Sequence, residues 1–130
     1  MPFLVVLAGA PSAAADGAGT SDPRPGVPYI GLAAWAGDTL RVVPTPSGRQ
    51  LAGELGKPSA AADQAWREVL NLAPDAERPG MYAQFVCHWR FAEFAEPGKD
   101  SWDLESWRPV VSDNAMVLAG CNPGGPEHEL

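Results

Sequence analysis

The fold is decided by residues 81–93, which read MYAQFVCHWRFAE. A helix would gather on one face Tyr82, Phe85, Val86, Trp89 and Ala92. A strand would gather Phe85, Cys87, Trp89 and Phe91 instead. We favour the helix, because Pro79 and Gly80 precede the stretch and because Ala, Gln and Glu are frequent in it. In either conformation Gln84 and His88 share a face, which makes them a candidate polar pair.

A second helix is expected upstream, over residues 59–72. A Pro-Ser pair can cap its start, and apolar residues recur at helical spacing. This apolar stripe consists of Ala65, Trp66, Val69, Leu70 and Leu72. The stripe predicts a helix that packs on the core through one face.

A β-hairpin is expected before that helix. The apolar runs 29–35 and 39–43 are separated by Ala-Gly-Asp, which can form a hairpin turn, and the second run is rich in strand formers. Pro44, Pro46 and Gly48 then end the hairpin. Residues 49–55 can form a helical turn.

The segment over residues 101–109 reads SWDLESWRP and carries an unusual number of Trp and charged residues. Alternation along an extended chain gives one side made of Trp102, Leu104 and Ser106, and another made of Asp103, Glu105 and Trp107. That geometry would display the carboxylates of Asp103 and Glu105 together.

A structural alternative exists for the same segment, and we favour it. The loop would be folded onto the core by Trp102 and Trp107, and Arg108 would bind Glu105 or a backbone carbonyl, since structural pairs of this kind are common. Pro109 restricts Arg108 to extended geometry and so fixes the direction of its guanidinium.

The N-terminus has the pattern of an export signal. Residues 1–10 are nearly all apolar, and three Ala precede Asp16 with the small side chains that a signal peptidase accepts. The basic residue that usually precedes the apolar run is absent, so Met1 could lie downstream of the true start. The alternative is a short buried helix or strand. The run is too short to span a bilayer, so no membrane span is expected after processing.

The chain divides into four expected parts. Residues 1–15 would be the signal peptide, 16–28 a Gly/Pro-rich leader, 29–125 a single globular domain and 126–130 an acidic tail. The localisation that follows is secreted or extracellular.

The two cysteines, Cys87 and Cys121, are expected to form a disulfide, because an even count in a small secreted domain usually means one. The bridge would close a loop of about 35 residues, which the chain-entropy estimate values at about 3–4 kcal/mol. The alternatives are a Cys-His nucleophile or a metal site that uses Cys87 and His88. A zinc site needs three or four ligands, and the two Cys and two His lack finger spacing. We expect neither a metal nor a cofactor.

Composition and charge indicate one folded, acidic domain. The 130 residues include five Trp and four Phe, which supply core material, and the formal net charge is -7. An acidic surface repels phosphate and the arginines are scattered singly, so nucleic acid is not an expected partner. No strand–helix–strand repeat appears, which favours antiparallel pairing. The expected fold class is α+β, with an N-terminal hairpin, two helices and a C-terminal extended region pinned by the disulfide.

Three segments of the chain form a pattern. They are Gln84-Phe85-Val86-Cys87-His88, residues 102–109 (WDLESWRP) and Cys121-Asn122-Pro123. Together they resemble an exported domain family of unknown function that is common in actinobacteria. The central motif of that family reads Trp-Asn-Leu-Glu-Pro-Trp-Arg-Pro, from which this chain departs at Asp103 and Ser106. The resemblance implies export, a single domain and pairing of the two cysteines, and it implies no activity.

Two classes of function fit these observations. The first, which we favour, is a secreted binding or interaction module whose partner is an extracellular protein or an envelope component. No complete set of nucleophile, base and orienting residue is present, which argues against catalysis. Aromatic and Arg side chains dominate binding hot spots. The candidate binding residues are Gln84, Trp102, Asp103 and Trp107, with Arg108 as a further anchor.

The second class is a small secreted hydrolase or nuclease-like effector. His88 would act as general acid or base, Glu105 or Asp103 as its carboxylate partner, and Gln84 as an orienting residue. Arg108 would stabilise a developing anion, because guanidinium binds phosphate or carboxylate in a bidentate manner. Convergence of His88, Glu105 and Arg108 in one solvent-open cleft would favour the enzyme. Burial of His88 against carbonyls and an internal pair for Arg108 would count against it.

Overall fold

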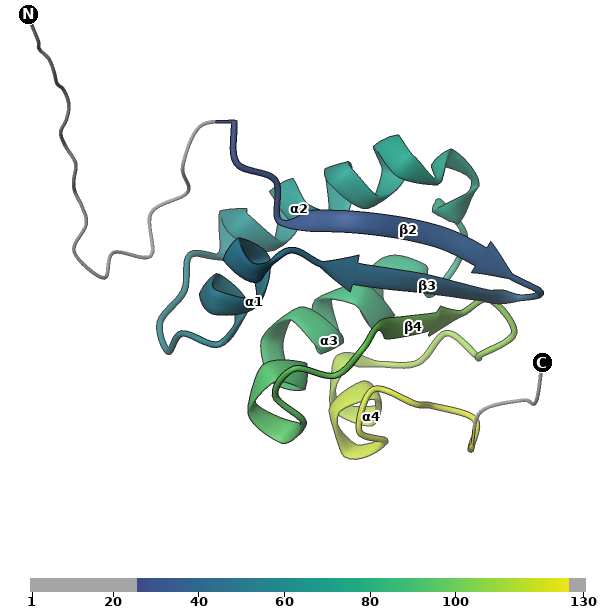
Figure 1. Ribbon diagram of the computed structural model, residues 1–130. Helices are drawn as coiled ribbons and strands as arrows, with labels where there is room; N and C mark the ends of the chain where they lie inside the picture. Colours follow the sequence, from purple (N-terminus) through teal and green to yellow (C-terminus); the bar gives the residue numbers. More distant parts are fainter. Residues whose placement is uncertain (1–25, 127–130) are drawn as a thin grey trace, which may run out of the picture.

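A three-stranded antiparallel sheet and the helices on one of its faces make up the fold (Figure 1). The computed structural model describes residues 26–126. In chain order the elements are β2 (Ile30–Ala36), β3 (Thr39–Pro44), α1 (Pro46–Ala52), α2 (Ser59–Leu72), the 3-10 turn η2 (Pro74–Ala76), α3 (Met81–Ala95), β4 (Trp102–Glu105) and α4 (Asp113–Leu118). The sheet order is β2-β3-β4. The α+β class, the hairpin and both long helices are therefore confirmed. The predicted signal peptide, most of the leader and the tail beyond Pro126 lie outside the described residues.

The hairpin of β2 and β3 forms around a two-residue turn. Ala36 pairs with Thr39, and Gly37 between them has a φ of 62°, which favours glycine. Along β3, Leu40 and Val42 are fully buried, whereas Arg41 between them is exposed. The alternation turns one face of the sheet toward the helices.

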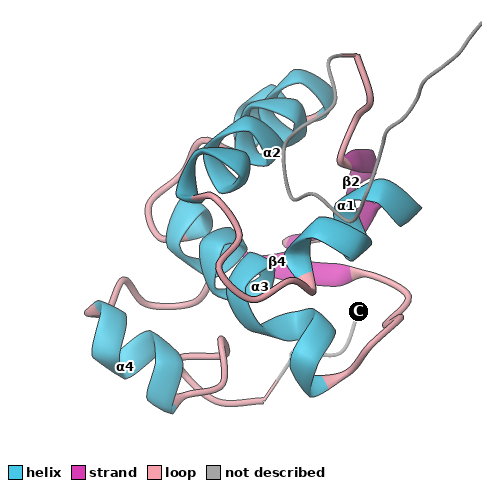
Figure 2. Cartoon of the chain, turned by 90° about the vertical axis from the view of Figure 1, so that its left-hand side faces the viewer, coloured by secondary structure: helices cyan, strands magenta, loops and turns pink. Residues whose placement is uncertain are grey.

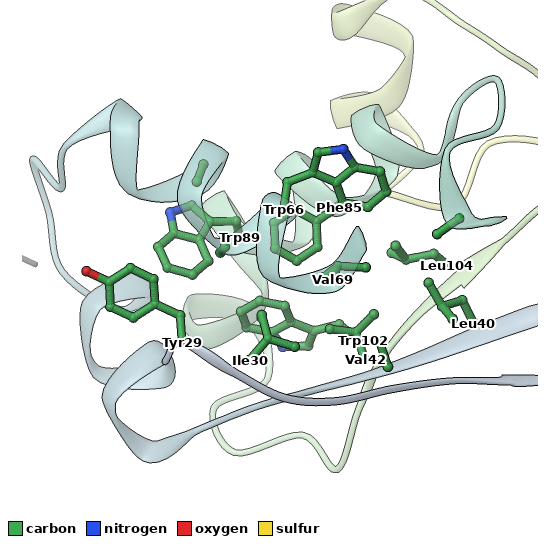
Figure 3. Packing of buried hydrophobic residues seen from close by; sticks show 14 of the residues in the cluster. Tyr29, Ile30, Leu40, Val42, Trp66, Val69, Phe85, Trp89, Trp102 and Leu104 are labelled. Atoms are coloured by element: carbon green, nitrogen blue, oxygen red, sulfur yellow. The ribbon is translucent and has the colours of Figure 1, made fainter. Parts of the chain in front are cut away.

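Aromatic side chains from both long helices and from β4 fill the space between the sheet and the helices (Figure 3). The ring of Phe85 lies 5.5 Å from that of Trp66 and 6.2 Å from that of Trp102, measured between centroids. Trp89 meets Trp102 edge to face. Residues 81–93 are helical because a helix brings Phe85 and Trp89 to the same buried face.

Helix α1 starts earlier than expected. Residues 49–55 were predicted as a helical turn, but the helix runs from Pro46 to Ala52. Thr45 caps it, since its hydroxyl accepts a hydrogen bond from the Gly48 amide (3.0 Å) and donates one to the Pro28 carbonyl (2.7 Å). Pro46 is thus the first residue of a helix and not merely the end of a strand.

The C-terminal region is less extended than expected, because it contains the short helix α4. Ser112 caps this helix by accepting a hydrogen bond from the Ala115 amide (3.2 Å). Met116 is its buried residue and packs beside the two cysteines. In residues 26–126, no helix has the length and apolarity needed to cross a membrane.

Candidate functional site

The disulfide between Cys87 and Cys121 ties the middle of α3 to the segment after α4. The two Cα atoms are 5.6 Å apart and the residues are 34 positions apart in sequence. This confirms the predicted pairing. Met116 and the half-buried Phe91 and Val111 pack around the bridge. The bridge therefore fixes the His-bearing helix against the C-terminal segment.

Gln84 joins the same helix to strand β4. Its side-chain amide donates to the Glu105 carbonyl (2.9 Å), and its side-chain oxygen accepts from the Glu105 amide (2.8 Å). Because Gln84 is buried, these two bonds satisfy polar groups that would otherwise be costly in the core. Gln84 thus acts as a structural clamp.

Arg108 is enclosed in a network that we call the Arg108 latch, made of Glu105, Arg108 and the carbonyls of Pro123 and Gly125. Its Nε and Nη2 atoms lie 2.8 and 2.7 Å from Oε1 of Glu105. Nη1 donates to the carbonyls of Pro123 (2.9 Å) and Gly125 (2.6 Å). Arg108 is 3% exposed and Glu105 1%. The favoured interpretation of Arg108 as an internal partner is confirmed.

The expectation that two carboxylates are displayed together is wrong. The strand ends at Glu105 and the chain turns back, which brings Arg108 onto the carboxylate and buries it. The Asp103 carboxylate is only half-buried and accepts a hydrogen bond from the Ser101 hydroxyl (2.6 Å).

The two Trp of the segment contribute to the fold. Trp102 is fully buried among the core aromatics. Trp107 is half-buried, and the Arg108 guanidinium lies 4.4 Å from its ring centroid. A partner could reach Trp102 or Arg108 only if the domain opened.

The side chain of His88 forms no hydrogen bond with the Arg108 latch. Among residues 26–126 its one hydrogen bond joins Nδ1 to the Gln84 carbonyl (2.8 Å), and it forms none with Glu105 or Arg108. Burial lowers the pKa of His88, and Lys99 and Arg108 lower it further, whereas the bond to the Gln84 carbonyl and the charge of Asp103 act in the opposite direction. Glu105 and Arg108 contact each other, whereas His88 bonds to neither of them and lines a cavity of about 320 Å³ whose lining includes neither.

A larger groove lies on a side of the domain next to this cavity, and Phe91 lines both. Figure 2 looks onto this side, where the α1–α2 loop, the start of α2 and α3 come together. The groove has a volume of about 570 Å³, and its exposed apolar lining includes Leu55, Tyr82 and Phe94. Sequence reasoning missed it, because the loop residue Leu55 and the helical residue Phe94 line one groove only through the packing of α3 near α1.

The charged side chains of the groove differ in the partners that they already have. Asp63 already accepts the Tyr82 hydroxyl (2.6 Å), a bond that raises the pKa of Tyr82. Lys57 lies 5.0 Å from the ring centroid of Phe94, and burial lowers its pKa. In the described part of the chain, neither Lys57 nor Arg90 lies within 4 Å of a carboxylate.

Comparison with known proteins places the chain in a family. Residues 31–124 match the family described as "Protein of unknown function (DUF2599)". The chain belongs to this family. It is 49% identical over 140 residues to an uncharacterized protein of Mycobacterium bovis, and equally to one of Mycobacterium tuberculosis, with 98% of this chain and 93% of each relative covered. An uncharacterized protein of Mycobacterium leprae is 55% identical over 65 residues, which cover 50% of this chain and 53% of that relative. No solved structure matches.

The family membership agrees with the resemblance stated from the sequence, both in the unknown function and in the actinobacterial origin of the relatives. Within residues 26–126, no group of three or more His, Cys, Asp or Glu side chains is placed to hold a metal ion.

Proposed function

We propose that this domain is an exported binding module and that its contact surface is the groove between the α1–α2 loop, the start of α2 and α3. The observation that carries the proposal is the gathering of exposed apolar side chains in one groove, together with two cations, Lys57 and Arg90, that form no ion pair with a described residue. Leu55 is 89% exposed, Tyr82 45% and Phe94 48%. Large apolar side chains grouped in this way mark interaction sites more often than scattered ones do.

The proposed occupant is a polypeptide segment of a partner protein that combines apolar and acidic residues. Apolar side chains of the partner would pack on Leu55 and Phe94, and its carboxylates would approach Lys57 and Arg90. The formal charge of the chain is -7, so an acidic partner is repelled by most of the domain. Lys57 and Arg90 would attract the partner's carboxylates locally. Glu54 and Asp63, which also line the groove, would limit how many acidic residues fit.

Export supports the same function. A disulfide persists in oxidising compartments, and residues 1–15 carry the features of a signal peptide. Sequencing the N-terminus of the secreted protein tests this part of the proposal. A chain that begins at Asp16 is expected, and retention of Met1 in a protein kept inside the cell would contradict it.

An enzyme that uses His88, Glu105 and Arg108 has weaker support. The guanidinium of Arg108 already has Glu105 and two backbone carbonyls as partners, which leaves it poorly placed to stabilise a new anion. His88 has no carboxylate bonded to either ring nitrogen within the described residues.

Selection from a library of displayed random peptides tests the groove. Wild-type domain should enrich peptides that combine apolar and acidic residues, and the affinity of those peptides is then measured by fluorescence polarisation. Phe94→Asp and Lys57→Glu should each weaken binding about tenfold or more, because one removes an apolar contact and the other reverses a charge.

The matched control is Leu118→Asp, since Leu118 is 88% exposed but lies on α4, outside the groove. This variant should bind as tightly as the wild type. Enriched peptides that bind all three variants equally, or a selection that enriches no sequence, would overturn the proposal.

A further inference from the structure

The cavity at His88 borders the groove at Phe91, which lines both, but it differs from the groove in chemistry. It lies between the C-terminal half of α3 and the segment that follows α4. Phe91, Ala95, Val117 and the disulfide at Cys121 supply apolar walls. Its volume of about 320 Å³ is at the small end of the range for sites that hold small molecules.

The Nε2 atom of His88 gives the cavity a hydrogen-bond acceptor. The Gln84 carbonyl can only accept a hydrogen bond, so Nδ1 must carry the proton that joins them. In the neutral ring, Nε2 is then an acceptor, and no described residue donates a hydrogen bond to it. Burial lowers the pKa of His88 and so favours this neutral form.

The other charged side chains of the lining are more exposed than His88. Glu96 is exposed and Lys99 is half-buried, whereas His88 is 6% exposed. Polar recognition at the buried wall therefore depends on the imidazole. An unprotonated Nε2 offers a lone pair and no proton, so it cannot bind a carboxylate or phosphate directly. A group that donates a hydrogen bond can bind it.

We propose that this cavity binds a small apolar molecule with a hydroxyl group, such as a phenol, whose hydroxyl donates to Nε2 of His88. The apolar body would pack against Phe91, Val117 and the disulfide. This site is independent of the peptide-binding function proposed for the groove. It also gives His88 a role that needs neither Glu105 nor Arg108.

Titration of the oxidised protein with 4-ethylphenol and 4-ethylanisole, followed by NMR, tests the proposal. The two probes are similar in shape, but the ether has no hydroxyl proton. The phenol should bind about tenfold more tightly, since the ether has no proton to donate to Nε2. The ring resonances of His88 and the methyl resonances of Val117 should shift with the phenol, and the same binding curve should fit both.

Three variants locate the site. Ala95→Trp fills the cavity without changing His88 and should abolish phenol binding. Val110→Trp adds the same ring at a position that is 67% exposed and does not line the cavity, so its affinity should equal that of the wild type. His88→Phe keeps a ring but removes the acceptor, and it should lose the preference for phenol over ether.

Several results would overturn the proposal. They are equal affinity for phenol and ether, phenol binding that survives Ala95→Trp, and the absence of saturable shifts at millimolar phenol. If His88→Phe fails to fold, the comparison of the two probes on wild type and on Ala95→Trp still decides the question. Phenol shifts confined to the groove residues Tyr82 and Phe94 would also count against it.

Discussion

The contacts of the Arg108 side chain could be predicted only in part from the sequence around it. Structural pairs of Arg with a carboxylate are common, which made an internal pair with Glu105 the favoured interpretation, and the ion pair at 2.7 Å confirms it. The two carbonyl acceptors at Pro123 and Gly125 could not be predicted, because their position depends on how the C-terminal turn packs.

Replacing Arg108 by Met should lower the free energy of unfolding by about 3–5 kcal/mol, because Glu105 would keep a buried charge without a partner. Urea denaturation measures the change. The double variant Arg108→Met with Glu105→Gln should recover part of the loss. Arg67→Met is the control, since Arg67 is exposed and makes no ion pair with a described residue. If Arg108→Met lowered the free energy of unfolding no more than Arg67→Met does, the stabilising role of the Arg108 latch would be contradicted.

His88 should make stability depend on pH. Its pKa is lowered in the folded state, so the unfolded chain binds the proton more readily. The stabilising contribution is complete above the unfolded pKa of about 6.5 and is lost as the pH falls from there toward the lower folded pKa, with a slope of up to about 1.4 kcal/mol per pH unit. Denaturation of wild type and His88→Gln across this range isolates the effect. Parallel curves for the two proteins would contradict it.

At the scale of elements, local signals predicted the long segments and misplaced a short one. The helix at 59–72 was recognised from the spacing of its apolar face, and it is present. The helix from 81 onward is also present, but there the spacing fitted a strand as well, and the preceding Pro79 and Gly80 and the composition decided the prediction. For α1 the same sequence, Pro-Thr-Pro-Ser-Gly, can end a strand or cap a helix. Contact of Thr45 with the Pro28 carbonyl favours the cap, and that contact is not visible in a local pattern.

Gly48 is the residue of α1 that should tolerate least change. A Cβ at this position would collide with the backbone carbonyl of Tyr29, which cannot move without disturbing the start of β2. Gly48→Ala should therefore lower the free energy of unfolding by about 3 kcal/mol. Gly31→Ala is the matched control, because its added Cβ would meet only ordinary contacts. In thermal melts, Gly48→Ala should have a clearly lower melting temperature than Gly31→Ala. Similar melting temperatures would contradict the close approach of Gly48 to the Tyr29 carbonyl.

At the scale of the whole molecule, the disulfide is a covalent long-range restraint. It follows from a cysteine count and an expected compartment, so it could be predicted. The groove and the cavity could not, since each is lined by residues from distant parts of the chain. Sequence patterns therefore predicted the hairpin, the long helices and the disulfide of the domain, but not its groove or its cavity.

Removing the disulfide tests how much it contributes to stability. Changing both Cys87 and Cys121 to Ser should lower the free energy of unfolding by about 3–4 kcal/mol, because the unfolded chain regains the freedom of the open loop. Denaturation of the wild type with and without a reducing agent provides a second measurement. A reduced protein as stable as the oxidised one would contradict this account.

The carbonyls that receive the Arg108 guanidinium come from residues beyond Cys121, and this sets a limit on shortening the chain. A protein cut after Cys121 keeps the bridge but loses the acceptors at Pro123 and Gly125, so a cation is left in the interior without them. A protein cut after Pro126 keeps them. Anyone trimming the C-terminus for crystallisation or fusing a tag there should keep every residue through Pro126.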